Sequence, residues 1–182
     1  MAFWTDNNVQ PKRNYRFVVQ ANTETQTSVI WWWAKTITLP SFEVSETEAH
    51  FLDNKYYFPG RLTWNDVTMT VTDPKSVDVV KTVAQQQVDA GYAISNAEGG
   101  TYKTIAKTLA TTALGEVAIS VYDANGTDVL EKWTLHNVWM KSAKFGDLDY
   151  SNEDFKMVEL TLRYDWAEHT AKGDNAPRFQ PS

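Results

Sequence analysis

The chain has 182 residues, of which 42% are hydrophobic and 22% are charged, and its formal net charge is −6 at pH 7. This composition is typical of one globular domain with a substantial core, and it excludes a disordered chain. An acidic chain is poorly suited to gripping a phosphate backbone, and the lack of cysteine excludes disulfides, thiolate chemistry and cysteine-ligated metals.

Aromatic residues make up 13% of the sequence, with eight tryptophans. Such residues favour strands and interfaces with other chains. The first residues, Met1 to Asp6, lack the basic flank and apolar run of a signal peptide, so we expect no secretory signal. The longest apolar stretch, Val29 to Ala34, is too short to span a bilayer.

The N-terminal part of the chain is predicted to hold two strands. Residues 1–14 show no periodicity and are expected to form an extended arm. A strand is predicted over residues 15–20, and a second over residues 29–39 that carries three consecutive tryptophans. Because successive strand side chains point to opposite faces, both faces of this second strand must be covered, or Trp32 must be buried by a neighbouring subunit.

A long excursion runs from Ile37 to Val71. It starts as an apolar strand stopped by Pro40, becomes polar, and returns through an aromatic patch capped by Pro59-Gly60. The strand that follows alternates apolar residues with threonines, the period of a half-buried strand. We predict a long hairpin here, and its length and charge indicate contact with another molecule.

Apolar residues that leave the domain core need another surface to bury them. We therefore predict contacts between subunits at Phe42, Val44, Phe51, Tyr56, Tyr57 and Phe58.

The remaining chain is predicted to hold two helices and four strands. Asp73-Pro74 is a helix start signal, and that helix would end at Gly91. A shorter helix over residues 102–113 would end at Gly115. Asn125-Gly126 is a strong hairpin signal. The four strands are predicted at residues 117–121, 129–135, 138–145 and 157–166.

About seven strands, one or two helices and hairpin connections predict a mainly β fold. We expect an antiparallel β-sandwich or split barrel with one or two flanking α-helices and a long protruding hairpin. The expected organisation is an N-terminal arm (1–14), a β domain (15–169) and an extended, exposed C-terminal tail (170–182).

Motifs for catalysis or metal binding are weak in this sequence. The three histidines are far apart and follow no metal-ligand spacing. A glycine-rich phosphate loop and a Gly-x-Ser-x-Gly nucleophile elbow are both missing. Residues 147–153 resemble a calcium loop only loosely, without its mid-loop glycine. We therefore predict no enzyme activity, no cofactor and no metal site. The tryptophans leave a carbohydrate-binding β-sandwich as an alternative.

A family pattern is visible in seven segments of the chain: Thr36 to Phe42, Asn54 to Gly60, Trp64 to Thr68, Val138-Trp139, Gly146 to Tyr150, Val158 to Leu162 and Tyr164 to Trp166. These segments resemble the tail tube proteins of contractile-tailed bacteriophages, which are related to the inner tubes of type VI secretion and of extracellular contractile injection systems. The resemblance extends from about Tyr15 to Glu168, so the arm and the tail lie outside it.

The resemblance implies a structural virion protein. Such proteins form six-membered rings that stack into a hollow tube inside a contractile sheath, and strands from all subunits close into one barrel around the lumen. The long hairpin would reach the neighbouring ring, and the helix from Pro74 to Asp89 would lie outside, near the sheath. An acidic lumen would let genomic DNA pass into the host without being held. The candidates for lumen charge are Glu43, Glu46, Glu48, Glu159 and Asp165.

The implied partners are further copies of the chain and the sheath, baseplate and tail-terminator proteins. The implied location is the virion tail, after synthesis in the host bacterial cytoplasm. A tube-initiating or tube-capping protein of the baseplate or tail end, with the same fold, is an alternative that the sequence leaves open.

Overall fold

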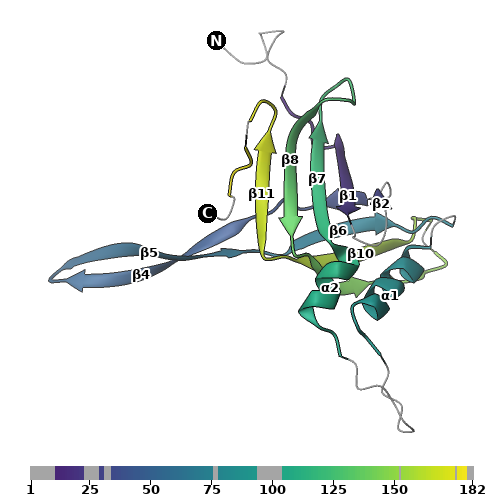
Figure 1. Cartoon of the computed structure of the whole chain (residues 1–182), viewed down its shortest axis with the longest axis horizontal. Coiled ribbons are helices and arrows are strands. Elements are labelled where there is room, and N and C mark those ends of the chain that lie inside the picture. The colour runs from purple at the N-terminus through teal and green to yellow at the C-terminus, as the bar shows by residue number, and fades with distance from the viewer. Residues whose placement is uncertain are drawn as a thin grey trace, which may run out of the picture.

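The computed structural model describes residues 11–22, 29–30, 34–75, 78–93, 104–151, 153–174 and 176–179. These residues form three antiparallel sheets and two short helices. Figure 1 shows a five-stranded sheet standing upright, a four-stranded sheet crossing below it, and a two-stranded hairpin that projects far to one side. The predicted mainly β fold, with flanking helices and a protruding hairpin, is therefore confirmed.

The five-stranded sheet contains β1 (Phe17–Asn22), β2 (Val29–Ile30), β7 (Glu116–Tyr122), β8 (Val129–His136) and β11 (Trp166–Ala171). Its strand order is β11-β8-β7-β1-β2, and each neighbouring pair is antiparallel. The predicted turn at Asn125-Gly126 joins β7 to β8. The Asn125 side-chain oxygen accepts bonds of 3.1 Å from the backbone N–H groups of Thr127 and Asp128, and Gly126 has a φ of 71°, which glycine adopts without strain.

The four-stranded sheet contains β3 (Ala34–Ile37), β6 (Val67–Thr72), β9 (Trp139–Lys144) and β10 (Met157–Arg163). Its order is β3-β6-β10-β9, again with antiparallel pairs throughout. The alternation predicted for β6 is confirmed, because Val67, Met69 and Val71 are buried and the intervening threonines are half-buried. One face of this sheet therefore lies on the core, and the other face is polar.

The hydrophobic core joins the two large sheets. Val19, Ile119 and Leu135 enter it from the five-stranded sheet, and Met69 and Leu160 enter it from the four-stranded sheet. Each of these side chains is at most 1% exposed. Since full burial of one such side chain stabilises the fold by roughly 1.5–3 kcal/mol, these residues hold the two sheets together. Trp64, at the end of β5, joins the same core from the hairpin.

The two helices are α1 (Val79–Asp89) and α2 (Lys107–Leu114). They lie against each other, and α2 also lies against β9 (Figure 1). The predicted helix start at Asp73-Pro74 is wrong, because α1 is capped by Asp78, whose side chain accepts a bond from the N–H of Lys81. Asp73 still accepts a 3.1 Å bond from the N–H of Val79, but it does so from outside the helix.

Both predicted helix stops are confirmed. Gly91 follows the last residues of α1 with a φ of 102°, and the N–H of Tyr92 donates to the carbonyl of Gln87 at 3.0 Å. This is the Schellman arrangement that glycine favours after a helix. Gly115 follows α2 with a φ of 71°.

The prediction of one strand over residues 157–166 is wrong. The chain bends at Tyr164-Asp165 and passes from β10 in one sheet to β11 in the other. The buried positions move from Tyr164 to Ala167 at this bend, so the two-residue period is broken and Trp166 is only half-buried. The apolar pattern of the sequence continues through the bend, because the strands before and after it both bury apolar side chains in the same core.

Two further differences concern the strand count and the chain ends. The described residues form eleven strands rather than about seven, since both hairpin arms are strands and two predicted strands are each divided. Residues 170–179 were expected to be extended and exposed, but β11 continues to Ala171 and Arg178 pairs with His169. A polar composition does not reveal such pairing. Trp32 and residues 1–10 lie outside the described residues.

Candidate functional site

A two-stranded hairpin leaves the body of the protein (Figure 1). It consists of β4 (Phe42–Phe51) and β5 (Asn54–Trp64). Every residue of β4 is exposed, and so is every residue of β5 before Trp64. Leu52, in the turn at the tip, is 87% exposed. An isolated strand pair has no core of its own, so this hairpin is the candidate contact element that the sequence predicts.

The register of the hairpin collects three aromatic rings on one face of its tip. Phe51 pairs with Asn54, and the pairs that follow at two-residue intervals place Tyr56 and Phe58 on the same face. These three side chains, which we name the tip cluster, are 68%, 52% and 58% exposed. Their burial therefore requires a second molecule.

The opposite face of the tip is charged. The Glu48 carboxylate lies 3.2 Å from the Lys55 ammonium and 3.5 Å from His50 Nε2. Tyr57 pairs with Glu48 across the two strands, so it lies on this face and not in the tip cluster. The Glu46 carboxylate has no hydrogen-bond or ion-pair partner within the described parts of the chain, although the residue pairs with Pro59 across the two strands.

The root of the hairpin packs partly on its own chain. The Phe42 ring meets Trp64 edge-on at a centroid distance of 5.5 Å and lies 5.8 Å from the ring of Phe179. Phe42, predicted as a contact between subunits, is thus shared with the body although it stays exposed. Val44 pairs with Leu62, and both side chains face solvent.

The five acidic residues predicted for the lumen occupy three different places. Glu43, Glu46 and Glu48 lie on the hairpin, where Glu43 accepts a 3.4 Å bond from the Asn65 amide. Glu159 lies on the polar face of the four-stranded sheet, 3.2 Å from the Lys144 ammonium. The three hairpin glutamates and Glu159 can line one channel only if the hairpin and the polar face of the four-stranded sheet both border that channel.

Asp165 does not lie on the polar face of the last strand, where it was predicted. It sits in the bend after β10, and its carboxylate is 2.7 Å from the Lys107 ammonium and 2.8 Å from the Asn137 amide. Burial raises the pKa of this carboxyl, but the bonds from Lys107 and Asn137 outweigh burial and hold the pKa below its usual value. The side chain therefore fastens α2 to the junction of the sheets.

A second ionic cluster lies where the hairpin joins the four-stranded sheet. The Asp66 carboxylate is 2.6 Å from Lys141 and 2.9 Å from Arg163, and Arg163 also donates a 2.8 Å bond to the carbonyl of Trp64. The bond from Lys141 lowers the pKa of Asp66, against the opposing effect of burial, and Arg163 lowers it further. The cluster ties the end of β5 to β9 and β10.

The four-stranded sheet has two open edges. Within the described residues, neither β3 nor β9 has a strand on its outer side. The polar face between these edges carries Thr68 and Thr70 of β6 opposite Thr161 and Glu159 of β10. Unpaired strand edges are templates for pairing with another chain.

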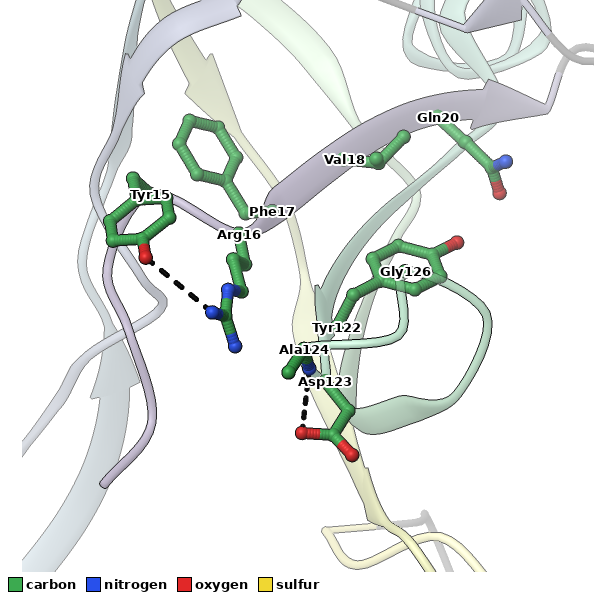
Figure 2. A pocket seen from close by; sticks show the side chains of 9 residues that line it. All are labelled: Tyr15, Arg16, Phe17, Val18, Gln20, Tyr122, Asp123, Ala124 and Gly126. Carbon is green, nitrogen blue, oxygen red and sulfur yellow. Dashed lines mark hydrogen bonds between the residues drawn. The ribbon is translucent and has the colours of Figure 1, made fainter. Parts of the chain in front are cut away.

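A surface hollow of about 440 Å³ lies between the start of β1 and the β7–β8 turn (Figure 2). The Arg16 guanidinium bonds the Tyr15 hydroxyl at 3.5 Å, and Asp123 accepts a 2.7 Å bond from the N–H of Ala124. Figure 2 shows Arg16 and Asp123 on opposite sides of the hollow. No nucleophile among the nine lining residues is hydrogen-bonded to a general base, which covalent catalysis requires.

The surroundings of His136 were not predictable from the sequence, because they bring together residues from three separate strands. Its Nδ1 lies 2.9 Å from a Glu116 oxygen, its Nε2 lies 3.4 Å from a Glu168 oxygen, and its ring stacks on Trp166 at 4.8 Å. Each carboxylate contacts a different ring nitrogen, so the two do not meet the ring at one point. In the part of the chain that the structure describes, no three His, Cys, Asp or Glu side chains form a metal site. None of the described helices is long and apolar enough to cross a bilayer.

The fold, the exposed hairpin and the open-edged sheet are those of a tail tube protein of contractile, phage-like particles. Residues 13–168 match the family described as T4-like virus tail tube protein gp19, and the chain belongs to that family. This is a family of structural proteins rather than enzymes. No curated protein matches the chain significantly.

Solved structures of contractile injection systems share this fold. The sheath/tube terminator of an extracellular contractile injection system, PVC, in its extended state is 17% identical, with a TM-score of 0.61, over 90% of this chain and 99% of that chain. The tube-terminating cap of the anti-feeding prophage is 19% identical, with a TM-score of 0.60, over 94% and 99% of the two chains. A chain of the six-fold symmetrised baseplate of that prophage is 13% identical, with a TM-score of 0.61, over 91% and 99%.

Proposed function

We propose that the chain is the inner tail tube subunit of a contractile particle, and that its copies form six-membered rings that stack into a hollow tube. The observation that carries this proposal is the tip cluster. Phe51, Tyr56 and Phe58 are exposed together at the end of a ribbon that has no core of its own. A stacked ring offers the second surface that would remove these rings from water.

Within a ring, we propose that β3 of one copy pairs with β9 of the next. The two open edges support this, because edge-to-edge pairing closes the four-stranded sheets of all copies into one barrel and leaves neither β3 nor β9 with an open edge. The polar face, with Thr68, Thr70, Thr161 and Glu159, would then line the channel.

The cargo of the channel is proposed to be genomic DNA, ejected into the host. The net charge of −6 supports this, since an acidic wall repels phosphates and lets DNA slide without being held. Glu43, Glu46, Glu48 and Glu159 remain the candidates for this wall. Asp165 is left out, because Lys107 holds it against α2.

The proposed partners are the sheath, the baseplate and the tail terminator. Proteins with this fold occur in a PVC sheath–tube complex and in a six-fold symmetrised prophage baseplate, which supports both the partners and the ring size. We propose that α1 lies on the outer surface, toward the sheath, and that the protein is made in the host bacterial cytoplasm before it joins the tail.

A tube-terminating or tube-initiating role is the second candidate. The PVC terminator and the prophage cap share the fold over at least nine-tenths of this chain, which favours it specifically. The two roles differ in their products, because a tube subunit adds copies without limit, whereas a terminator stops at a single ring. The carbohydrate-binding alternative is not retained, since the four described tryptophans are buried or half-buried.

Electron microscopy of the purified protein over a range of concentrations tests the proposal. Rods of variable length with a central channel are the expected result. Single rings that never lengthen would favour the terminator role. Monomers under every concentration and salt condition would contradict both.

A further inference from the structure

The C-terminal segment folds back onto the body after β11. The backbone groups of His169 and Arg178 exchange two hydrogen bonds of 2.8 and 3.2 Å. Asp174 holds this return in place, because its carboxylate pairs with Arg178 at 3.2 Å and accepts a 3.2 Å bond from the N–H of Ala171. The family match ends at residue 168, so this segment lies beyond the residues that the family model matches.

The returning segment carries one aromatic ring to the root of the hairpin. The ring of Phe179 lies 5.7 Å from Trp64 and 5.8 Å from Phe42, which belong to the two hairpin strands. On its other side it stacks on Trp133 of β8, at 6.4 Å and 22°. A single side chain thus connects the hairpin to the five-stranded sheet.

The backbone of Phe179 supports the importance of this contact. Its φ is 65°, in the left-handed region that bulky residues rarely adopt. Such a conformation persists only where surrounding contacts compensate for it. The three ring contacts of Phe179 provide this compensation, as does the pairing of Arg178 next to it.

We propose that Asp174 and residues 176–179 are a clamp that sets the angle at which the hairpin leaves the body, with Phe179 as the positioning residue. The hairpin acts as a long lever, because the eleven residues of β5 span about 36 Å at about 3.3 Å per residue. A change of about 10° at the root would therefore move the far end of the hairpin, next to the tip cluster, by about 6 Å, which exceeds the spacing of about 4.8 Å between neighbouring strands. The proposed consequence for ring stacking rests on the function proposed above.

The first experiment uses full-length monomer under dilute conditions and measures amide hydrogen exchange at residues 42–44 and 62–64. Phe179→Ala should speed exchange at this root about tenfold while β7 and β8 keep their protection. Phe179→Tyr, which keeps the ring, should restore the wild-type rate. Arg178→Ala should give an intermediate exchange rate at the root. This variant replaces Phe179→Ala as the test if Phe179→Ala also reduces the protection of β7 and β8. An unchanged rate at the root in both alanine variants would overturn the clamp.

The second experiment counts and measures rods by electron microscopy. Phe179→Ala should give few and short rods, and Phe179→Tyr should give normal ones. Loosened roots with rods of normal length and number would overturn the positioning role. If the wild-type protein forms no rods or rings, the proposed function fails, but the exchange measurement on the monomer still decides whether the clamp exists.

Discussion

Gly60 and Ser45 face each other across the hairpin so closely that no side chain fits between them. A Cβ atom on Gly60 would lie 3.0 Å from the carbonyl oxygen of Ser45 and closer still to its hydroxyl. The register shifts by one residue at this point, and Ser45 Oγ accepts a 2.8 Å bond from the N–H of Arg61. A bulge of this kind bends a strand pair and increases its twist, so it sets the direction of the tip cluster.

Gly60→Ala should therefore distort the hairpin and spare the core. The Ser45 hydroxyl can rotate away from the new methyl group, but the backbone carbonyl cannot. We expect the melting temperature of the monomer to change by no more than about 2 °C, and the protein concentration needed for rod formation to rise about tenfold or more. Pelleting assays and thermal melts measure the two quantities.

Gly126→Ala is the matched control. Unlike Gly60, Gly126 has a positive φ, but a Cβ there would meet nothing within 4 Å, and the residue lies in the β7–β8 turn. This variant should lose about 1 kcal/mol of stability through backbone strain and still form rods. Rods of Gly60→Ala at the wild-type concentration would show that the bulge does not direct assembly.

The tip cluster gives a second prediction. Replacing Tyr56 and Phe58 by serine should abolish rods, because the double change removes two of the three rings that a neighbouring copy would cover. Folding should persist, with a stability change within about 0.5 kcal/mol, since both side chains are more than half exposed and lie outside the core. Sedimentation and circular dichroism measure assembly and folding.

Tyr92→Ser controls for the loss of an exposed tyrosine. Tyr92 is 54% exposed, close to the 52% of Tyr56, but it follows α1 on the body. The Tyr92→Ser variant should form rods as the wild type does. If the double serine variant assembles as well as Tyr92→Ser, the tip cluster is not a stacking surface.

The parts of this fold that follow a local pattern could be predicted from the sequence. The alternation of apolar and polar residues identified β6 and β10. Asn125-Gly126 marked the turn between β7 and β8, and Gly115 marked the end of α2, because each position requires a particular backbone conformation. The hairpin was predictable for a different reason. Its aromatic residues had no core to enter, so composition alone indicated a projecting element.

Features made by distant segments were not predictable. The bend at Tyr164-Asp165 has no glycine or proline to mark it, and both sheets bury apolar residues in the same core. The contacts of Phe179 with Phe42 and Trp133 join positions far apart in sequence, and ring contacts leave no periodic signal. Only the tertiary fold shows that a polar tail carries an aromatic ring in contact with three others.

The ionic cluster around Asp66 predicts a pH dependence of stability. The folded protein lowers the pKa of Asp66 below its usual 3.8, so the carboxylate stabilises the fold above that pH. This contribution is lost as the pH falls through the lowered folded-state value. Asp66→Asn should cost about 1–3 kcal/mol at pH 7, because Lys141 and Arg163 lose a charged acceptor. The difference from wild type should shrink below about pH 4 and vanish in stronger acid.

Denaturant unfolding of both proteins between pH 2 and pH 7 measures this difference. Asp128→Asn is the control, since Asp128 pairs with Lys172 at the surface and its pKa is also lowered. Exposed pairs contribute little, so its curve should stay close to that of the wild type. A penalty for Asp66→Asn that is equal at pH 7 and at pH 2 would show that the cluster stabilises by packing rather than by charge.

The proposed channel wall gives the last prediction. Glu159→Lys places a second cation beside Lys144 on the polar face of the four-stranded sheet, and each ring repeats the change in every copy. Assembled rods of this variant should retain short DNA fragments at low salt, protect them from nuclease, and release them as salt is raised. Wild-type rods should retain none.

Asp89→Lys makes the same change of charge at the end of α1, on the surface proposed to face the sheath. DNA bound by its rods should remain open to nuclease, because it would lie outside the tube. Glu159→Gln should retain little DNA, since it removes one negative charge without adding a positive one. If DNA on Glu159→Lys rods is digested as fast as DNA on Asp89→Lys rods, the polar sheet face does not line the channel, and the barrel must close with that face outward.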